Sequence, residues 1–459
     1  MFAGFANAKE PVVGVNNTGG HLTIDGISTE LTFDSHYAGL TKKQLRKFVK
    51  GHEFFNELWV LAPAPGVWGL GPTFNEANCA GCHPRNSRAK AANDGSVIEK
   101  GMLVKLGVLS GEDLGKVIPH PAYGGQLQNR AAENRVPSEG HATVEYEDKI
   151  YTYPDGMNVV LRKPKISFNQ MNFGPVGSEA VSSLRIAPQV IGLGLLEWVP
   201  VDAILKIAEQ QEKMGVSGKA HFVQNLETET LALGRFGWKA TQPNIKQQVA
   251  TAFHTDIGAT TFFFPEKNCP EVQVGCRSLP SAAKCGGQGG CTGNNFRPEV
   301  LPSRLKSLTL YLQTLNIPSR RLDNKEEVLR GESIFNEVGC SSCHIPALKT
   351  GDVKEFPQFS HMTFHPFTDL LLHDLGEDLA DGHTEGDATA AEWRTPPLWG
   401  IGLLNMVTAG NVGLLHDGRA RNVEEAILWH GGEAEKSRIG FTMLEKFDRD
   451  ALVSFVNSL

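Results

Sequence analysis

The chain has 459 residues, of which 41% are hydrophobic and 21% charged, and its formal net charge is -7 at pH 7. This length and hydrophobicity allow two or three domains with buried cores. The charges are of mixed sign without a basic stripe, which argues against nucleic acid as a partner. No segment approaches the roughly 18 consecutive apolar residues of a membrane-spanning helix, so no membrane span is expected.

The N-terminal region is predicted to be irregular and then helical. Residues 1–40 mix Gly, Asn and Thr with short apolar segments and read as an irregular extension. From Thr41, a candidate N-cap, Phe48 and Phe55 belong to a run of apolar residues at helical spacing. This pattern predicts an amphipathic helix that ends before Pro63.

Two motifs of the form Cys-x-x-Cys-His follow, at residues 79–83 and 340–344. This is the attachment pattern for a c-type haem, in which two thiols bond to one porphyrin and the adjacent imidazole becomes an iron ligand. With 8 Cys and 15 His, a random chain would contain about 0.005 such motifs. Zinc sites or disulfides are the alternative, but zinc needs four ligands and each motif supplies three. The predicted attachment residues and iron ligands are Cys79, Cys82 and His83 in the first motif and Cys340, Cys343 and His344 in the second.

Haem c is attached outside the bacterial cytoplasm, so we expect an exported, periplasmic protein whose signal peptide is absent or trimmed from this chain. The other four cysteines, Cys269, Cys276, Cys285 and Cys291, lie in a Gly-rich segment. In an oxidising compartment they should form two disulfides, with three pairings open. A metal or redox-active thiol site is the alternative.

Between and after the motifs, the patterns alternate between strand and helix. Residues 102–173 are predicted to be β-rich, with a turn between two strands at residues 153–156. Helices are expected at residues 201–213, 245–253, 325–338 and 422–429, and apolar residues at helical spacing indicate two more at 305–315 and 444–459. Phe-Asn-Glu precedes both motifs at the same offset, and Arg185 and Arg394 open similar Arg-x-x-Pro segments. These echoes indicate an internal duplication.

The two motifs, the Arg-x-x-Pro segments and residues 415–420 and 424–432 resemble the bacterial di-haem cytochrome c peroxidases and the MauG-like superfamily. The branch that they resemble more closely is the di-haem oxidoreductases, often labelled thiol oxidoreductases. The resemblance covers residues 40–459. The expected fold is mainly α, with two cytochrome-c-like haem domains related by duplication and a β-rich insertion in the first. The predicted parts are an N-terminal extension (1–40), an N-terminal haem domain (41–318) with its insertion (102–173) and four-Cys loop (269–291), and a C-terminal haem domain (319–459).

The resemblance implies a sixth ligand for the C-terminal haem. Relatives take this ligand, a Met or a Tyr, from the end of a helix, and the matching residue in this chain is His430. An iron bound by His344 and His430 would have a lower reduction potential than a His/Met iron. The alternative is a helix-terminal His that interacts with the helix dipole, followed by Gly431 as a cap.

The resemblance also implies an acid beside the N-terminal haem, where Asp256 takes the position of a Glu in the relatives. A carboxylate there can move a proton between the two oxygens of peroxide. A turn-forming Asp before Gly258 is the alternative. His254, two residues earlier, is a candidate for assisting the reaction or for ligating iron.

Further residues are assigned roles by the same resemblance. Trp238 is the nearest replacement for an electron-relay Trp, with core packing as the alternative. Arg185 and Arg394 could bind haem propionates or form salt bridges within the protein, and His416 could lie near a propionate or an iron ligand. Calcium is an additional expected ion, with Asn411 and Gly413 near the matching loop.

The expected enzyme is a peroxidase-type oxidoreductase with two covalently bound haem c groups. It would reduce hydrogen peroxide, or another small oxidant, at the N-terminal haem, with electrons relayed through the C-terminal haem from an external donor protein or small reductant. The alternatives are a di-haem electron-transfer cytochrome, or a MauG-like or oxygenase relative that oxidises a protein or organic substrate. A homodimer is one candidate assembly.

Overall fold

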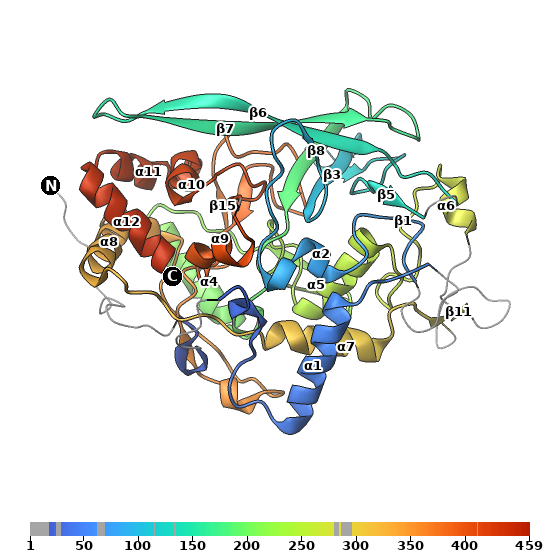
Figure 1. Ribbon diagram of the computed structural model, residues 1–459, viewed down its shortest axis with the longest axis horizontal. Helices are drawn as coiled ribbons and strands as arrows, with labels where there is room; N and C mark the ends of the chain where they lie inside the picture. The colour runs from blue at the N-terminus through green and yellow to red at the C-terminus, as the bar shows by residue number, and fades with distance from the viewer. Residues whose placement is uncertain are drawn as a thin grey trace.

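The computed structural model describes residues 18–23, 29–61, 69–113, 115–132, 135–279, 284–285, 296–410 and 412–459. Figure 1 shows a body of helices and loops with a long β-hairpin laid across it. The expected mainly α fold with two cytochrome-c-like domains is wrong, because 33% of the structure is helical and 20% is strand. Strands also form outside the predicted insertion, and loops carry much of the chain around the two motifs.

Twelve α-helices lie in the part of the chain that the structure describes. They are α1 (Lys42–Asn56), α2 (Cys79–Cys82), α3 (Leu193–Glu197), α4 (Val201–Lys213), α5 (Ile245–Ala252), α6 (Val274–Ser278), α7 (Pro302–Gln313), α8 (Lys325–Glu337), α9 (Leu404–Val407), α10 (Val423–Trp429), α11 (Glu435–Thr442) and α12 (Lys446–Ser458). The helices predicted at 201–213, 245–253, 325–338 and 422–429 are confirmed to within one residue at each end.

The strands form two three-stranded sheets, β4-β3-β8 and β2-β6-β7, and five two-stranded ladders among the described residues. They are β1 (Thr73–Phe74), β2 (Ser96–Val97), β3 (Met102–Leu109), β4 (Val117–Pro119), β5 (Arg130–Ala131), β6 (His141–Thr152), β7 (Asn158–Asn169), β8 (Ala180–Ile186), β9 (Phe222–Asn225), β10 (Thr230–Leu233), β11 (Lys284–Cys285), β12 (Phe296–Arg297), β13 (Leu348–Lys349), β14 (Thr363–Phe364), β15 (Leu372–Asp374) and β16 (Glu392–Arg394). All these pairings are antiparallel.

The longest pairing is the hairpin of β6 and β7, in which all twelve residues of each strand are in register from His141↔Asn169 to Thr152↔Asn158. The predicted turn at residues 153–156 is confirmed, since Gly156 N donates to Tyr153 O at 2.9 Å. β7 is an edge strand and carries Pro164 between two lysines, which are devices that discourage pairing with another chain.

Two pairs of helices pack closely against each other, α1 with α7 and α8 with α12. Thr41 caps α1 in a capping box with Gln44, as its position before the apolar run predicts. Gly51 of α1 lies against the backbone of α7, and Gly331 of α8 lies against Ala451 O of α12. A Cβ at either glycine would clash with these backbone atoms, so both helix pairs need glycine at this position in order to pack closely.

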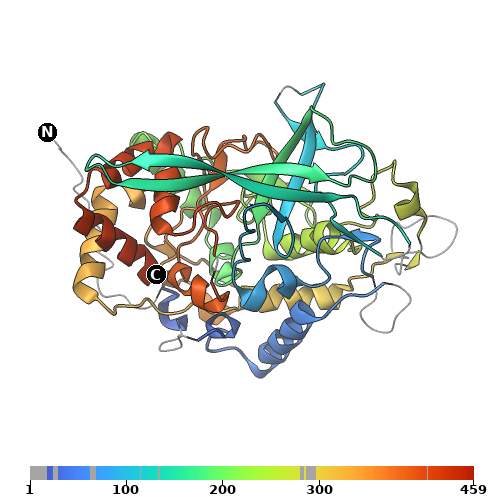
Figure 2. The ribbon, with the colours of Figure 1, turned by 45° about the horizontal axis from the view of Figure 1, so that its top comes forward.

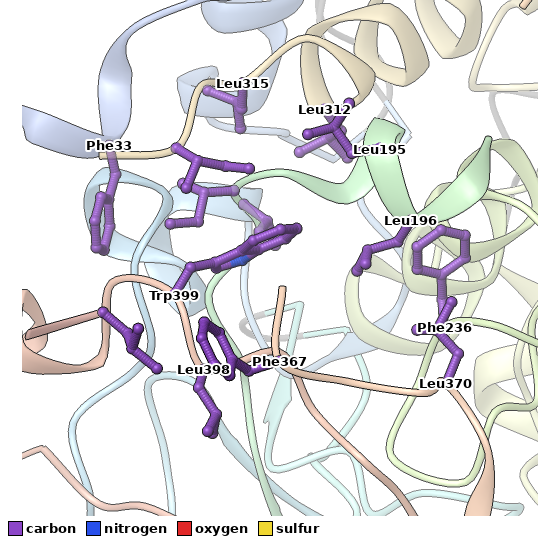
Figure 3. Close-up of a cluster of buried hydrophobic side chains, with 14 of the residues drawn as sticks. Phe33, Leu195, Leu196, Phe236, Leu312, Leu315, Phe367, Leu370, Leu398 and Trp399 are labelled. Atoms are coloured by element: carbon purple, nitrogen blue, oxygen red, sulfur yellow. The ribbon is translucent and has the colours of Figure 1, made fainter. Parts of the chain in front are cut away.

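The main hydrophobic cluster extends from the N-terminal segments to the last residue of the chain. Figure 3 shows Trp399 at its centre, among Phe33, Leu315, Phe367 and Leu398. A second cluster packs β3 and β8 against the first residues of β6, including Met102, Ile186 and Val144. The predicted domain boundaries stay a prediction. No helix among the described residues is long and apolar enough to cross a membrane.

Candidate functional site

The first Cys-x-x-Cys-His motif forms a short helix followed by its histidine. Asn78 caps α2 by accepting a hydrogen bond from Gly81 N at 2.8 Å. His83 follows directly, and its backbone N–H donates to Cys79 O at 2.9 Å. This single turn places the thiols of Cys79 and Cys82 and the His83 ring against one cavity.

The second motif has a similar local arrangement on a different scaffold. It follows α8 through Gly339 and begins as a 3-10 turn, Cys340–Ser342. The His344 backbone N–H donates to Cys340 O at 3.0 Å, as His83 does to Cys79. Cys340, Cys343 and His344 line the same cavity as the first motif.

This shared cavity has a volume of about 2110 Å³. Typical small-molecule and cofactor pockets reach roughly 1,000 Å³, so the cavity has room for two large groups. The four cysteines of the two motifs have free thiols. Two large planar groups, each bonded to a pair of thiols and to one imidazole, therefore fit the residues present.

Both motif histidines have one ring nitrogen bound to a backbone carbonyl. His83 Nδ1 lies 2.7 Å from Pro188 O, and His344 Nδ1 lies 2.8 Å from Phe367 O. A carbonyl only accepts, so Nδ1 carries the proton in both rings and Nε2 keeps its lone pair for a metal. Burial lowers the pKa of both imidazoles to about 4, which keeps them neutral and able to ligate iron.

Asp256 lies beside the first motif. It belongs to a π-helical turn, η4 (Phe253–Ile257), that continues α5, and its carboxylate faces the cavity. Burial raises the pKa of Asp256, while hydrogen bonds from Gln126 Nε2 at 2.7 Å and Thr255 Oγ1 at 3.1 Å oppose the shift. Burial, and then the charge of Asp256, raise the pKa of Cys79 to about 12. The Asp256 backbone carbonyl accepts hydrogen bonds from Asn75 N at 2.8 Å and Glu76 N at 3.2 Å, which places the acid close to the segment that leads into the first thiol pair.

A second buried acid, Glu139, is connected to the Asp256 turn through hydrogen bonds. Gln128 connects the two: its Nε2 donates to Thr255 O at 2.8 Å, and its backbone N donates to Glu139 Oε2 at 2.6 Å. Gln273 Nε2 donates to Glu139 Oε1 at 2.6 Å. Burial raises the pKa of Glu139 to about 8 despite these hydrogen bonds. Sequence reasoning missed Glu139, because nothing in its neighbourhood predicts burial of an acid.

Gln273 lies in the loop closed by a disulfide between Cys269 and Cys276, which is one of the pairings left open by the sequence. The Cys285 side chain and Cys291 lie outside the described residues. Asn411 lies outside them as well, so the calcium site stays a prediction. Gly413 packs against the backbone of Gly418.

His430 lies beside the second motif. It directly follows α10, which Asn422 caps, and its Nδ1 is 2.6 Å from Ala426 O. The His430 ring faces the cavity and contributes to lowering the pKa of His344, so the two imidazoles lie near each other. Gly431 has extended dihedrals, φ -130° and ψ -159°, and does not form a left-handed cap.

His254 is turned away from the other candidates. Its ring is stacked on Phe264 at a centroid distance of 4.9 Å, and it does not line the cavity as Asp256 does. Burial lowers the pKa of His254 to about 4, and its Nδ1 has no hydrogen-bond partner among the described residues. The structure therefore brings Asp256, but not His254, to the first motif.

The predicted arginines differ in their partners. Arg185 forms ion pairs with Asp381 at 2.7 Å and Glu385 at 3.0 Å, as its alternative interpretation expects. Arg394 donates to two backbone carbonyls, those of Gly237 and Thr395, and forms no ion pair with any described residue. Burial lowers the pKa of Arg394 to about 10. It remains a cation at neutral pH and lines the cavity, as an anion-binding group would.

A third arginine, Arg88, was missed by sequence reasoning. It lines the cavity and donates from Nη2 to Leu415 O. Among the described residues, its Nε has no hydrogen-bond partner and its guanidinium forms no ion pair. Burial lowers the pKa of Arg88 to about 9, against the nearby charge of Asp417. No motif surrounds Arg88 in the sequence, and only its burial beside the cavity distinguishes it.

Aromatic residues also line the cavity. Trp238 donates from Nε1 to Ile186 O at 2.9 Å, and the Arg88 guanidinium lies 5.1 Å from the centre of its ring. His416 is stacked on Trp393 with ring centroids 3.6 Å apart. Burial, and then the charges of Arg419 and Arg185, hold the pKa of His416 well below its ordinary value. Trp393 was not predicted, because its strand is short and only folding brings its stacking partner, His416, to it.

A buried histidine beside the second motif was also missed. His373 lies 3.6 Å from Cys343 Sγ through Nδ1, which also contacts Glu433 at 2.9 Å, while its Nε2 contacts Asp369 at 2.8 Å. Burial alone would lower the pKa of His373, but hydrogen bonds to Asp369, Cys343 and Glu433 raise it to about 12. Cys343, Asp369 and His373 are close enough to hold a metal ion. Because each ring nitrogen of His373 faces a carboxylate, we assign a proton to both nitrogens and no metal ion to this cluster.

No curated protein matches the chain. A family model described as "Di-haem oxidoreductase, putative peroxidase" matches residues 12–459. The match includes both motifs, Asp256 and His430. The chain therefore belongs to the di-haem oxidoreductase family.

Proposed function

We propose that the protein is a periplasmic di-haem c oxidoreductase that reduces hydrogen peroxide at the site of His83. One observation carries this proposal: the two motifs have the same proximal arrangement, whereas the residues facing them differ. The backbone carbonyl of Asp256 accepts hydrogen bonds from Asn75 and Glu76, which lead into the first motif, and His430 lines the cavity together with the second motif. An acid suits proton transfer to a bound oxidant, and a second imidazole suits a closed iron that passes electrons.

The residues of each motif would hold one haem c. The two thiols of each Cys pair would form the thioether bonds, and Nε2 of His83 or His344 would ligate the iron. When bound, the haem groups supply one-electron redox chemistry and an iron position that an oxygen ligand can occupy. Arg88 and Arg394 are cations without ion-pair partners among the described residues, and we assign them to the haem propionates.

Asp256 acts on the protons of the reaction. Reduction of one hydrogen peroxide molecule to two waters consumes two protons and two electrons. The Asp256 carboxylate takes a proton from one peroxide oxygen and returns it to the other, so that the oxygen that departs leaves as water. Gln126 and Thr255 hold the carboxylate in place. The electrons come from an external redox protein or a small reductant and pass through the second haem site.

The periplasmic location is supported by two features. Covalent haem attachment to Cys-x-x-Cys-His motifs takes place outside the bacterial cytoplasm. The Cys269–Cys276 disulfide fits an oxidising compartment. The family match supports the di-haem oxidoreductase class and is silent on compartment and oxidant.

The experiment is an EPR and absorption study of the resting holoprotein, combined with steady-state peroxide turnover using a reduced small cytochrome or dye as donor. We expect one high-spin and one low-spin iron, with rapid peroxide consumption. Two low-spin irons and no high-spin signal would contradict the proposal and identify an electron-transfer cytochrome. One high-spin iron with slow peroxide turnover would also contradict it and would favour oxidation of a protein or organic substrate.

A further inference from the structure

The β6–β7 hairpin, residues 141–169, connects two distant parts of the molecule. We call its turn and the adjoining strand ends, residues 149–162, the hairpin tip. Each strand has twelve residues, which corresponds to a length of roughly 40 Å at 3.4 Å per residue. In Figures 1 and 2, one end of the hairpin lies beside β3 and β8 and the other lies over the C-terminal helices.

The hairpin is anchored in both hydrophobic clusters. At its root, Ala142 and Val144 are buried in the cluster that contains β3 and β8. At its tip, Tyr153 is 2% exposed and Leu161 is 1% exposed, and both belong to the main cluster together with Trp429. Burial of the apolar surface of these side chains stabilises both ends of the hairpin. The tip is therefore a packed contact.

The polar contacts of the tip concentrate on the start of α10. Tyr153 donates from its hydroxyl to Glu424 Oε1, in the first turn of α10, at 2.8 Å. Arg162 donates to Arg419 O at 2.8 Å and to Gly418 O at 3.1 Å, just before the helix. Arg421 donates to Val160 O of the hairpin and also binds Glu425 in α10. The hairpin thus holds the residues that lead into the helix.

Two further contacts reach the end of α10 and the helix behind it. Lys149 lies 5.3 Å above the ring of Trp429, the last residue of α10, and its ammonium contacts Asp378 at 2.6 Å. Arg449 of α12 donates to Asp155 Oδ2 at 2.7 Å and lies 4.1 Å above the Tyr153 ring. The tip therefore contacts both ends of α10.

His430 depends on this helix for its position. α10 has only seven residues, and a helix of that length is not stable by itself, so tertiary contacts must fix it. The bond from Nδ1 to Ala426 O orients the His430 ring relative to α10 but not relative to His344. An axial ligand must be held to within about 0.5 Å of its productive geometry. The contacts that hold α10 therefore determine the position of His430.

We propose that the hairpin tip is a positioning clamp for α10 that holds His430 against the second motif. The inference rests on the proposed ligation of one iron by His344 and His430. Tyr153 and Arg162 are the positioning residues, since they contact α10 or its leading segment and do not line the cavity. Asp155 is 40% exposed, so its ion pair with Arg449 contributes less than the buried Tyr153 ring.

The test compares the holoprotein with Tyr153→Ala/Arg162→Ala, with the milder Arg162→Ala, and with a control, Glu147→Ala/Lys165→Ala. The control removes an ion pair on the same hairpin whose side chains are 64% and 63% exposed. Two properties are measured: hydrogen–deuterium exchange of the amides of residues 423–430, and the low-spin EPR signal of the second iron. We expect exchange to be about tenfold faster in the double variant, with a smaller increase in Arg162→Ala. Part of the low-spin signal should become high-spin, and the control should match the wild type.

Unchanged exchange and an unchanged EPR signal in both hairpin variants would overturn the clamp. If Tyr153→Ala/Arg162→Ala fails to fold, Arg162→Ala and Tyr153→Phe decide, since each removes polar contacts with α10 or its leading segment and leaves the core ring or the turn intact. A failure of the proposed function looks different. In that case the low-spin signal of the wild type would survive His430→Ala, whereas the exchange data would still report whether the hairpin holds α10.

Discussion

The two Cys-x-x-Cys-His motifs can be compared atom by atom on their proximal sides. In each motif, the backbone N–H of the histidine donates to the carbonyl oxygen of the first cysteine, and the ring Nδ1 donates to another backbone carbonyl. Burial lowers the pKa of both imidazoles to about 4. The opposite sides diverge. An acid within an amide network faces the first motif, and a second imidazole faces the other. Two motifs of the same pattern are thus faced by different side chains, which come from residues far away in the sequence.

The largest effect is expected from removal of one motif at a time. Cys79→Ala/Cys82→Ala should reduce the covalently bound haem from two groups per chain to one and abolish peroxide turnover. Cys340→Ala/Cys343→Ala should also leave one haem, but with the high-spin signal retained. Haem content by absorption after alkaline pyridine treatment, together with EPR, checks both. Equal EPR spectra for the two variants would contradict the proposed difference between the two sites.

Substitution of Asp256 should affect the first site alone. Asp256→Asn keeps the shape and the hydrogen-bonding capacity but cannot take a proton, so peroxide turnover should fall by about 10²–10⁴-fold. The low-spin signal of the second iron should not change. Retention of full activity in steady-state assays would remove Asp256 from the mechanism.

The same variant has a predictable pH dependence. Burial raises the pKa of Asp256, so wild-type activity should decline on the acid side at a higher pH than for an ordinary carboxyl group, and Asp256→Asn should lack this decline. A raised pKa in the folded state means that ionisation of Asp256 destabilises the fold as pH rises through that pKa. Asp256→Asn should therefore unfold at the same or a higher temperature than the wild type at neutral pH.

Substitution of His430 should affect the second site alone. His430→Met replaces an imidazole by a thioether, which should raise the reduction potential of the second iron by on the order of 0.1 V. His430→Ala should convert its signal from low spin to high spin. Spectroelectrochemical titration measures the first change and EPR the second. A low-spin signal that persists in His430→Ala would mean that another residue closes this iron.

The smallest effect concerns stability on the side of the first motif. The pKa of Glu139 is raised to about 8 from an ordinary value of 4.5. The stability that the protonated acid contributes is fully present below pH 4.5 and is lost as pH rises toward 8. Glu139→Gln should remove this pH-dependent loss, so its unfolding midpoint should fall less than that of the wild type between pH 5 and pH 8. Thermal unfolding midpoints at pH 5 and pH 8 test this, with Glu147→Gln on the exposed hairpin as the control.

The sequence predicted local features better than the fold. Helical periodicity located α4 at its observed ends, and the N-cap candidate Thr41 marked the start of α1. The mainly α fold class was wrong, because β8 pairs with β3 across some 70 residues and short ladders such as β15-β16 carry no periodic signal. Residues that depend on such long-range contacts could not be assigned.

The site likewise has residues that the sequence predicts and residues that it does not. The two motifs, Asp256 and His430 were identified by pattern or by resemblance, and the structure places the last two beside the first two. Arg88, Trp393, His373 and Glu139 escaped notice. What distinguishes these four is burial or a partner brought close by folding, such as the two carboxylates around His373. Neither property is encoded in a short stretch of sequence.

The carbonyl groups of Pro188 and Phe367, which bind the two proximal rings, also bear on how such a protein can evolve. Every amino acid carries a backbone carbonyl, so no substitution at position 188 or 367 deletes either acceptor. The hydrogen bond that orients each of the two motif histidines is thus protected against mutational drift. Side chains such as Asp256 and His430 have no such protection. Divergence in reactivity among chains of this kind should therefore accumulate on the sides opposite the motif histidines.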